Sequence, residues 1–338
     1  MNVPEPRQLP SGAWNIQLRK EGESITESTA ERCRRAALEV RRKWLAEEKL
    51  GLHKSPDAVV SLGDAIDSYI ASNSNILSVS TQRAYKSYRK HRMQSCMDWN
   101  IFDESNPWQA AINSELEDVS AKTVANVWRL CTVAIRSAGA PVPDVRLRRY
   151  VLKESQFLRY DQIDKFLDVI KGEECELGCL LALNSLRHSE IIALKPSDIS
   201  IEDQKLIVRG SRVLNSDGIY EYSELNKTKK SRREIPIIIP RLLELLKEVD
   251  PNDEYVFDWS NKRLYDHIQR ICKKNDLPPI GVHALRHSFA SLAYHIGWKE
   301  KSTEAIGGWS NSATVRNIYT HNADLDADIK AMQEFYER

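Results

Sequence analysis

The sequence predicts a multidomain, mainly α-helical protein with small antiparallel β-sheets. At 338 residues the chain exceeds one ordinary domain, and its 41% hydrophobic and 29% charged residues are typical of a globular protein. Apolar residues recur at helical spacing over most of the chain after residue 58, and short alternating stretches lie near the N-terminus and between residues 205 and 238. We expect three domains, at residues 1–52, 58–142 and 155–338.

The first 52 residues predict a small sheet followed by a helix. Residues 9–19 begin with a turn and then alternate, and residues 23–26 form a returning strand after a Glu21-Gly22 turn. A helix is expected from about residue 29 to residue 49, with arginines and lysines interleaved with acidic residues. This charge pattern fits a solvated helix face and contact with a DNA groove equally well.

Residues 58–142 predict an all-α domain. Ser61 is expected to cap a helix that follows a proline-containing linker, and Ser80 or Thr81 to cap the next one. That second helix places basic residues on one face, which suits phosphate contact as well as a plain surface helix. These residues are Arg83, Lys86 and Lys90. Further helices at 105–140 complete the domain, and a basic linker at about 141–155 is expected near DNA.

Residues 155–338 predict helices around small sheets. Helices are expected at 160–170, 177–183, 240–249 and 261–276, and strands at 205–210, 219–222 and 233–238. Arg187 follows the almost wholly apolar helix, where a buried charge is costly unless it is paired or binds an anion. Its partner in the first case would be Glu190.

Three further groups of residues suit phosphate chemistry. Residues 226–233 form a basic turn between two predicted strands, and a lysine there can reach into a site, although most such runs are solvated loops. His283 and Arg286 are three residues apart, so they share a helix face, and an arginine donates two parallel hydrogen bonds to phosphate. Trp309 follows a Gly-Gly turn, and Tyr319 lies beyond it. Together they predict a phosphate-binding site with a tyrosine nucleophile.

Composition limits the other classes of function. The six cysteines are scattered without a CxxC pair, which indicates buried free thiols in a reducing cytoplasm and predicts no metal site. The net charge of +1 neither indicates nor excludes a nucleic-acid partner. No run approaches the roughly 18 apolar residues of a membrane span, so we expect no membrane association.

The chain resembles the tyrosine site-specific recombinases, in particular the phage and conjugative-element integrases. The resemblance is carried, in the order and at the approximate spacing of that family, by residues 186–191, 227–236, 283–287 and 309–319. It implies an α+β catalytic domain over about 155–325. It also implies an all-α core-binding domain and a small N-terminal β-sheet-plus-helix arm-binding module upstream.

The resemblance also implies a mechanism. Tyr319 would attack the scissile phosphate to form a 3′-phosphotyrosine, while Arg187 and Arg286 neutralise the phosphate. Lys227 would protonate the leaving 5′-oxygen, with Lys229 as the alternative, and His283 would assist proton transfer at the nucleophile or hold the phosphate. Trp309 stands where many relatives carry histidine; its indole N–H can donate a hydrogen bond but cannot shuttle a proton. No metal, cofactor or ATP is implied.

Partners and location follow from the same resemblance. They are double-stranded DNA at attachment sites, a homotetramer on DNA, a host bending protein and an excision factor, in the bacterial cytoplasm at the nucleoid. The expected function is integration and excision of a phage or mobile element. The alternatives are a chromosome-dimer resolvase, a type IB topoisomerase-like enzyme and a catalytically silent DNA-binding regulator.

Overall fold

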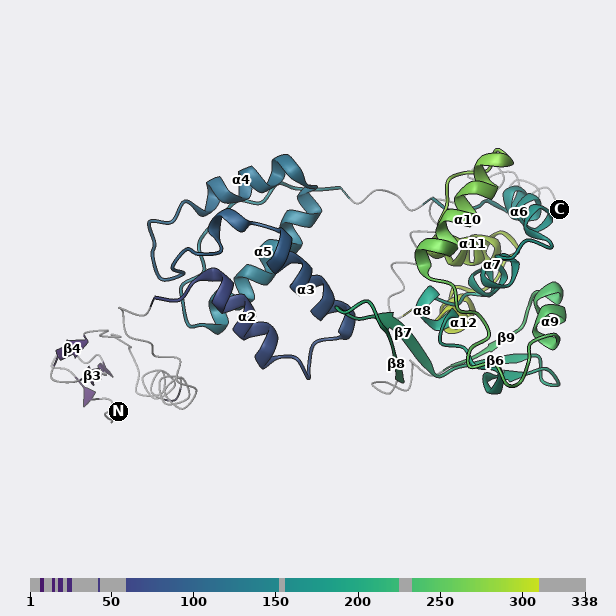
Figure 1. Cartoon of the computed structure of the whole chain (residues 1–338), viewed down its shortest axis with the longest axis horizontal. Coiled ribbons are helices and arrows are strands. Elements are labelled where there is room, and N and C mark those ends of the chain that lie inside the picture. The colour runs from purple at the N-terminus through teal and green to yellow at the C-terminus, as the bar shows by residue number, and fades with distance from the viewer. Residues whose placement is uncertain are drawn as a thin grey trace, which may run out of the picture. The chain divides into compact units, whose positions relative to one another are not determined.

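The computed structural model describes residues 7–8, 14–15, 18–20, 23–25, 42, 59–151, 156–224 and 233–309. The chain divides into two compact units, Met1–Val151 and Leu152–Arg338 (Figure 1). Helices dominate both, and the strands form only small antiparallel sheets, which confirms the predicted fold class in outline. None of the described helices is long and apolar enough to cross a membrane. The finer division into three domains stays a prediction.

Two short antiparallel ribbons lie near the N-terminus of the first unit. Strand β1 (Arg7–Gln8) pairs with β2 (Trp14–Asn15), and β3 (Leu18–Lys20) pairs with β4 (Glu23–Ile25). Lys20 lies opposite Glu23, so two residues separate the paired strands, as the predicted hairpin requires. The helix predicted at 29–49 lies outside the described residues apart from Arg42, and the arm-binding role stays a prediction.

A helical body with its own apolar core completes the first unit. Its helices are α2 (Leu62–Ser72), α3 (Val79–His91), α4 (Trp108–Asp118) and α5 (Ala121–Ser137), with a 3-10 turn, η1, at Gln94–Cys96. Residues from three of these helices are almost fully buried together: Leu62, Ile66, Ile112, Leu130 and Ile135. No residue of α3 is fully buried, and its Tyr85 and Tyr88 pack partly buried against this core.

The two predicted helix caps in this unit had different outcomes. The Ser61 hydroxyl accepts a hydrogen bond from the Asp64 amide at the start of α2, which confirms that cap. The cap predicted at Ser80 or Thr81 is wrong, because Ser78 accepts the bond from the Thr81 amide. Helix α3 therefore begins at Val79.

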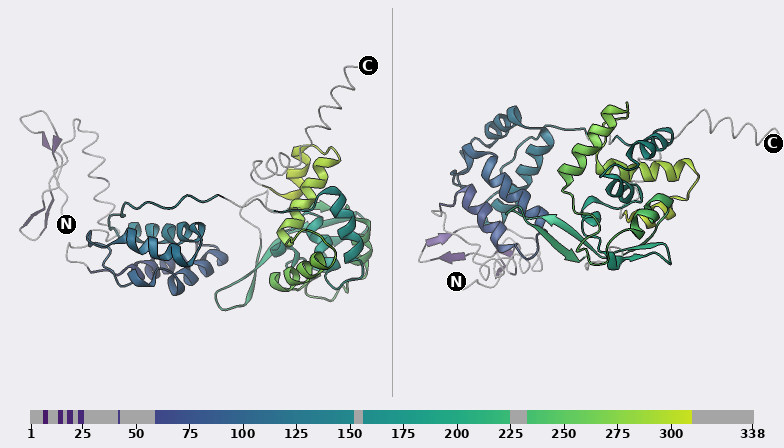
Figure 2. Two further views of the ribbon diagram at one scale, coloured as in Figure 1. Left: turned by 90° about the horizontal axis from the view of Figure 1, so that it is seen from above. Right: turned by 45° about the vertical axis from the view of Figure 1, so that its right-hand side comes forward.

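The second unit is built around helix α7. Its helices are α6 (Tyr160–Ile170), α7 (Glu176–Leu183), α8 (His188–Ile191), α9 (Pro240–Lys247), α10 (Asn261–Lys274), α11 (Val282–His295) and α12 (Glu300–Gly307), with a 3-10 turn, η2, at Pro196–Asp198. Figure 2 shows them gathered into one body, from teal α6 to yellow-green α12. Apolar side chains from four helices are fully buried in one core: Phe166, Leu181, Leu264 and Leu285. The five described cysteines are free and buried, as predicted, and Cys33 lies outside the described residues.

The strands of the second unit do not pair as predicted. Strands β5 (Ile199–Ser200), β6 (Lys205–Val208) and β9 (Arg233–Pro236) form one sheet, and β7 (Gly210–Leu214) pairs with β8 (Tyr220–Glu224) in another. The predicted strand at 205–210 is therefore divided. The chain leaves the first sheet at Gly210, where a Cβ atom would lie 2.4 Å from the Tyr222 ring.

This pairing corrects the predicted basic hairpin. The turn at 226–233 was expected to join two paired strands, but β8 and β9 belong to different sheets. Residues 225–232 connect them and lie outside the described residues.

Candidate functional site

Arginines from three distant segments meet around one buried carboxylate. Arg187 directly precedes α8, Arg233 begins β9 and Arg286 lies in α11, while Glu190 is in α8 and only 3% exposed. The Glu190 carboxylate accepts a 2.8 Å hydrogen bond from Arg187 Nη1 and two 2.9 Å bonds from the Arg233 guanidinium. Arg286 Nη1 lies 3.8 Å from Glu190 Oε2.

The cluster carries an excess of positive charge. Burial alone would raise the pKa of Glu190, but the hydrogen bonds and charge of Arg233, together with Arg187, lower it to about 2. Glu190 is therefore ionised at neutral pH and neutralises one of three guanidinium groups. The remaining positive charge, in a partly buried site, favours an anion that accepts hydrogen bonds, such as phosphate.

Arg286 is the most enclosed of these groups. Its guanidinium donates hydrogen bonds to the carbonyl oxygens of Ser185 and Gly307, and its central carbon lies 4.5 Å from the centre of the Trp309 ring. Burial and the charge of Arg187 lower the pKa of Arg286 to about 9, so it stays charged at neutral pH. Its side chain is 1% exposed, and its buried Nε has no hydrogen-bond partner among the described residues. Trp309 therefore covers one face of the Arg286 guanidinium.

The end of α12 approaches the arginines because two glycines are present. A Cβ atom on Gly307 would lie 1.8 Å from the Trp309 ring, and one on Gly308 would lie 2.8 Å from Arg233 Nε. Gly308 also has a φ of 60°, in the left-handed region that glycine tolerates best. Its carbonyl oxygen accepts a 2.8 Å hydrogen bond from Arg187 Nη2.

His283 lies one helical turn before Arg286 on α11. Partial burial and the positive charges of Arg286 and Arg187 lower the pKa of His283 below its ordinary value. His287 packs edge-on against it at 4.5 Å, and burial, His283 and Arg286 lower the pKa of His287 to about 4. Both rings are therefore neutral at neutral pH, and a neutral imidazole can act as a base.

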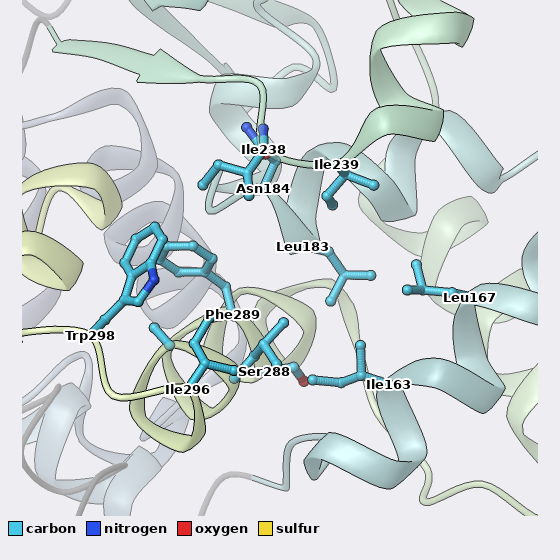
Figure 3. Close-up of a pocket in the computed structure, with 12 residues that line it drawn as sticks. Ile163, Leu167, Leu183, Asn184, Ile238, Ile239, Ser288, Phe289, Ile296 and Trp298 are labelled. Atoms are coloured by element: carbon cyan, nitrogen blue, oxygen red, sulfur yellow. The ribbon is translucent and has the colours of Figure 1, made fainter.

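An apolar pocket lies behind the tryptophan. Phe289 stacks on Trp309, with ring centres 6.3 Å apart and an angle of 16° between the planes. Phe289 also lines a cavity of about 90 Å³ whose other walls are mostly aliphatic (Figure 3). Labelled residues around it include Ile163, Leu167, Ile238, Ile296 and Trp298. Trp309 is thus held between the Arg286 guanidinium and an apolar wall.

Four of the six predicted site residues come together in the structure. They are Arg187, His283, Arg286 and Trp309. Lys227, the alternative Lys229 and the nucleophile Tyr319 lie outside the described residues. The catalytic roles of all the predicted site residues stay predictions.

Sequence reasoning missed two members of the site. Glu190 was expected only as an ion-pair partner of Arg187, but it also binds Arg233 and lies close to Arg286. Arg233 was one of several residues in a basic run. Arg233 lies where that basic run meets an apolar strand, and this position was the sequence signal that could have singled it out.

Comparisons with known proteins agree with this geometry. A tyrosine recombinase XerC-like protein of Caldanaerobacter subterraneus subsp. tengcongensis is 26% identical over 191 residues, which cover 48% of this chain and 49% of the relative. The ICEBs1 integrase of Bacillus subtilis is 27% identical over 202 residues, 54% of each chain. The chain therefore spans about half the length of these curated relatives.

A solved structure of similar fold extends over more of the chain. The lambda integrase tetramer bound to a Holliday junction aligns with a TM-score of 0.58 and 18% identity, covering 94% of this chain and 95% of that one. The model of the phage integrase family matches residues 156–325, which is 170 of the 338 residues and includes every predicted site position. The chain belongs to the phage integrase family.

Proposed function

We propose that this protein is a site-specific DNA recombinase that cuts and rejoins DNA through Tyr319, integrating and excising a phage or mobile element. The observation that carries the proposal is the positively charged site that Arg187 and Arg286 form around Glu190, beside a neutral His283. Membership of the phage integrase family supports the same chemistry, and one relative is itself named an integrase.

Each residue has a defined part in the proposed reaction. Tyr319 attacks phosphorus, so a tyrosyl ester forms at the 3′ end while the bond from phosphorus to the 5′-oxygen breaks. His283 accepts the tyrosine proton, and Lys227 gives a proton to the leaving 5′-oxygen. Arg187 and Arg286 stabilise the charge that builds up on the phosphate oxygens. The reverse step, with a 5′-hydroxyl of a partner strand, restores the phosphodiester without ATP.

Strand exchange between two duplexes sets the number of copies that are needed. Four strands are cut, each by one tyrosine, so we expect four copies on the DNA, with residues 58–142 on the core sites and 1–52 on outlying arm sites. Lambda integrase forms a tetramer on a Holliday junction, which supports this stoichiometry. A host bending protein and an excision factor are the further partners we expect, on DNA of the bacterial nucleoid.

A nicked suicide substrate tests the proposal. With the element's own attachment DNA, the wild-type protein is expected to form a covalent protein–DNA adduct, because the short fragment beyond the nick diffuses away and rejoining fails. Tyr319→Phe is expected to form none, because phenylalanine has no nucleophilic oxygen. Tyr265→Phe, at an exposed tyrosine of α10, is the matched control and should form the adduct. The absence of an adduct with the wild type, or its persistence in Tyr319→Phe, contradicts the proposal.

A chromosome-dimer resolvase is the second candidate, because one relative is named XerC-like. The two candidates share the chemistry and differ in the DNA they recombine. Cleavage of a chromosomal terminus site in preference to an element's attachment site would favour the resolvase.

DNA binding is expected to fall steeply with salt. Lys86 and Lys90 are exposed on one face of α3, where neutralising phosphates releases counterions. Replacing both with glutamine is expected to reduce the slope of log affinity against log salt by about 2, one for each lysine. Lys262→Gln, which removes a lysine paired with Asp266 at 2.9 Å, is the control and should leave the slope unchanged. A salt titration of binding to one duplex measures all three proteins.

A further inference from the structure

The three arginines of the site differ in how far solvent reaches them. The Arg187 side chain is 40% exposed, the Arg233 side chain 9% and the Arg286 side chain 1%. Arg187 is therefore the arginine that an incoming phosphate meets first. The groups that hold the Arg187 guanidinium determine whether its solvent-exposed side points toward that phosphate.

Glu190 fixes Arg187, and Arg233 in turn saturates Glu190. Each carboxylate oxygen accepts one bond from Arg187 and one from Arg233. Arg187 Nη1 and Arg233 Nη1 bind Oε1 at 2.8 and 2.9 Å, while the Arg187 amide and Arg233 Nη2 bind Oε2 at 2.8 and 2.9 Å. As a result, the Arg187 side chain contacts Glu190 through only one of its terminal nitrogens, and its Nη2 binds the Gly308 carbonyl oxygen instead.

Arg233 also contacts the opposite wall of the site. Its Nε donates a 3.3 Å hydrogen bond to the Ile306 carbonyl oxygen at the end of α12, next to the Gly307-Gly308 turn. Its backbone is fixed by the pairing of β9 with β6, where Arg233 lies opposite Val208. One side chain on a sheet thus connects the loop of Arg187 to the turn that precedes Trp309.

We propose, on the basis of the DNA-cleaving function above, that Arg233 is a positioning residue: it occupies Glu190 so that Arg187 keeps its outer face open to the scissile phosphate. Without Arg233, Glu190 Oε2 is free to accept a second side-chain bond. The planar fork of Arg187 then pairs with both carboxylate oxygens, a strongly favoured geometry. Arg187 leaves the Gly308 carbonyl and turns inward, away from the DNA.

The test compares Arg233→Gln, Arg233→Lys and a matched control in the full-length protein. Arg212 is the control because it is similarly buried, at 13% exposure, and binds Asp258 at 2.7 Å without contacting Glu190. The measurements are the single-turnover rate of adduct formation on saturating suicide DNA, the affinity for that DNA and the melting temperature. Arg233→Gln is expected to slow cleavage roughly a hundredfold at unchanged affinity, as loss of one oriented electrostatic contact does. Arg233→Lys, which keeps the charge, should recover part of the rate, and Arg212→Gln should cleave near the wild-type rate.

A second substrate separates the two ways in which Arg233 could act. Sulfur in place of the bridging 5′-oxygen leaves without protonation and so does not need a lysine acid. If Arg233 acts through Arg187, the defect of Arg233→Gln persists on the sulfur substrate. Restoration of the rate by sulfur would mean that Arg233 serves the lysine of the preceding segment, and the proposal would be wrong.

Three other results decide the matter. A wild-type rate in Arg233→Gln overturns the proposal, as does equal slowing of Arg233→Gln and Arg212→Gln with equal loss of melting temperature. The fall in cleavage rate at acid pH should begin at a higher pH in Arg233→Gln, because Glu190 then keeps Arg187 and Arg286 as its positive neighbours among the described residues. An unchanged pH–rate profile in Arg233→Gln contradicts the proposed role of Arg233.

If the wild-type protein itself forms no adduct, the proposed DNA-cleaving function is wrong, and the variants then do not test the role of Arg233.

Discussion

Glu190→Gln is expected to lower the free energy of unfolding by about 3–5 kcal/mol, the usual cost of removing one partner from a buried ion pair. The glutamine would leave the guanidinium groups of Arg233 and Arg286, 9% and 1% exposed, without their negative neighbour. Its amide nitrogen would also face a donor where the carboxylate had an acceptor. Urea unfolding of the full-length protein, followed by circular dichroism, measures the loss.

The effect should depend on pH in a defined direction. The pKa of Glu190 in the folded protein is about 2, below its ordinary value of 4.5. A depressed carboxylate pKa contributes stability that is fully present above the ordinary value and is lost as pH falls toward the folded value. The difference between wild type and Glu190→Gln should therefore be greatest above pH 4.5 and shrink between pH 4.5 and about 2.

Asp266→Asn is the control for this experiment. Asp266 is 52% exposed and pairs with Lys262 across one turn of α10, a type of surface pair that contributes at most about 1 kcal/mol. Its replacement should change stability little at any pH. Equal effects of the two substitutions, or a Glu190→Gln protein as stable as the wild type at neutral pH, would show that the carboxylate does not hold the arginines together.

Arg286→Lys is expected to slow DNA cleavage by roughly 10²–10³-fold while leaving DNA affinity almost unchanged. Lysine keeps the positive charge but has a single nitrogen, which cannot occupy the positions from which Arg286 Nη1 and Nη2 bind the carbonyls of Ser185 and Gly307 and also hold the planar fork toward phosphate. It also loses the stacked contact with Trp309. Charge alone therefore does not replace the guanidinium.

Single-turnover cleavage of the suicide substrate, with binding measured separately, tests this expectation. Arg263→Lys is the control, because Arg263 is 54% exposed and its carboxylate partner Glu174 is 72% exposed. That protein should cleave like the wild type. A rate for Arg286→Lys within a fewfold of the wild type would exclude a direct role of Arg286 in stabilising the transition state.

Local sequence signals predicted the parts of the site that depend on short separations. His283 and Arg286 lie on one helix, and the Ser61 cap starts another, because each depends on residues three apart in the chain. The almost wholly apolar composition of 177–183 likewise predicted the buried α7, most of whose residues the structure places in the core. In these segments local composition and residue spacing were sufficient.

Contacts between residues far apart in the chain could not be predicted in this way. The bond between Arg233 and Glu190 joins residues 43 apart, and it requires β9 to pair with β6. Strand lengths of four or five residues do not determine which strand pairs with which, so β8 was expected beside β9. The cover that Trp309 forms over Arg286 depends on packing against Phe289, for which no spacing rule exists.

The divided strand has a consequence for the proposed lysine acid. Glu224 lies opposite Gly210 of β7 and Arg233 lies opposite Val208 of β6, so the residues that flank 225–232 are paired beside positions only two residues apart in the chain. The entropy of closing a connection between two fixed residues changes slowly, by about 0.6 kcal/mol for each doubling of its length. Within this family, its length can therefore change with little effect on folding. For the proposed role of Lys227, the length of this connection would then matter through its reach toward the DNA rather than through stability.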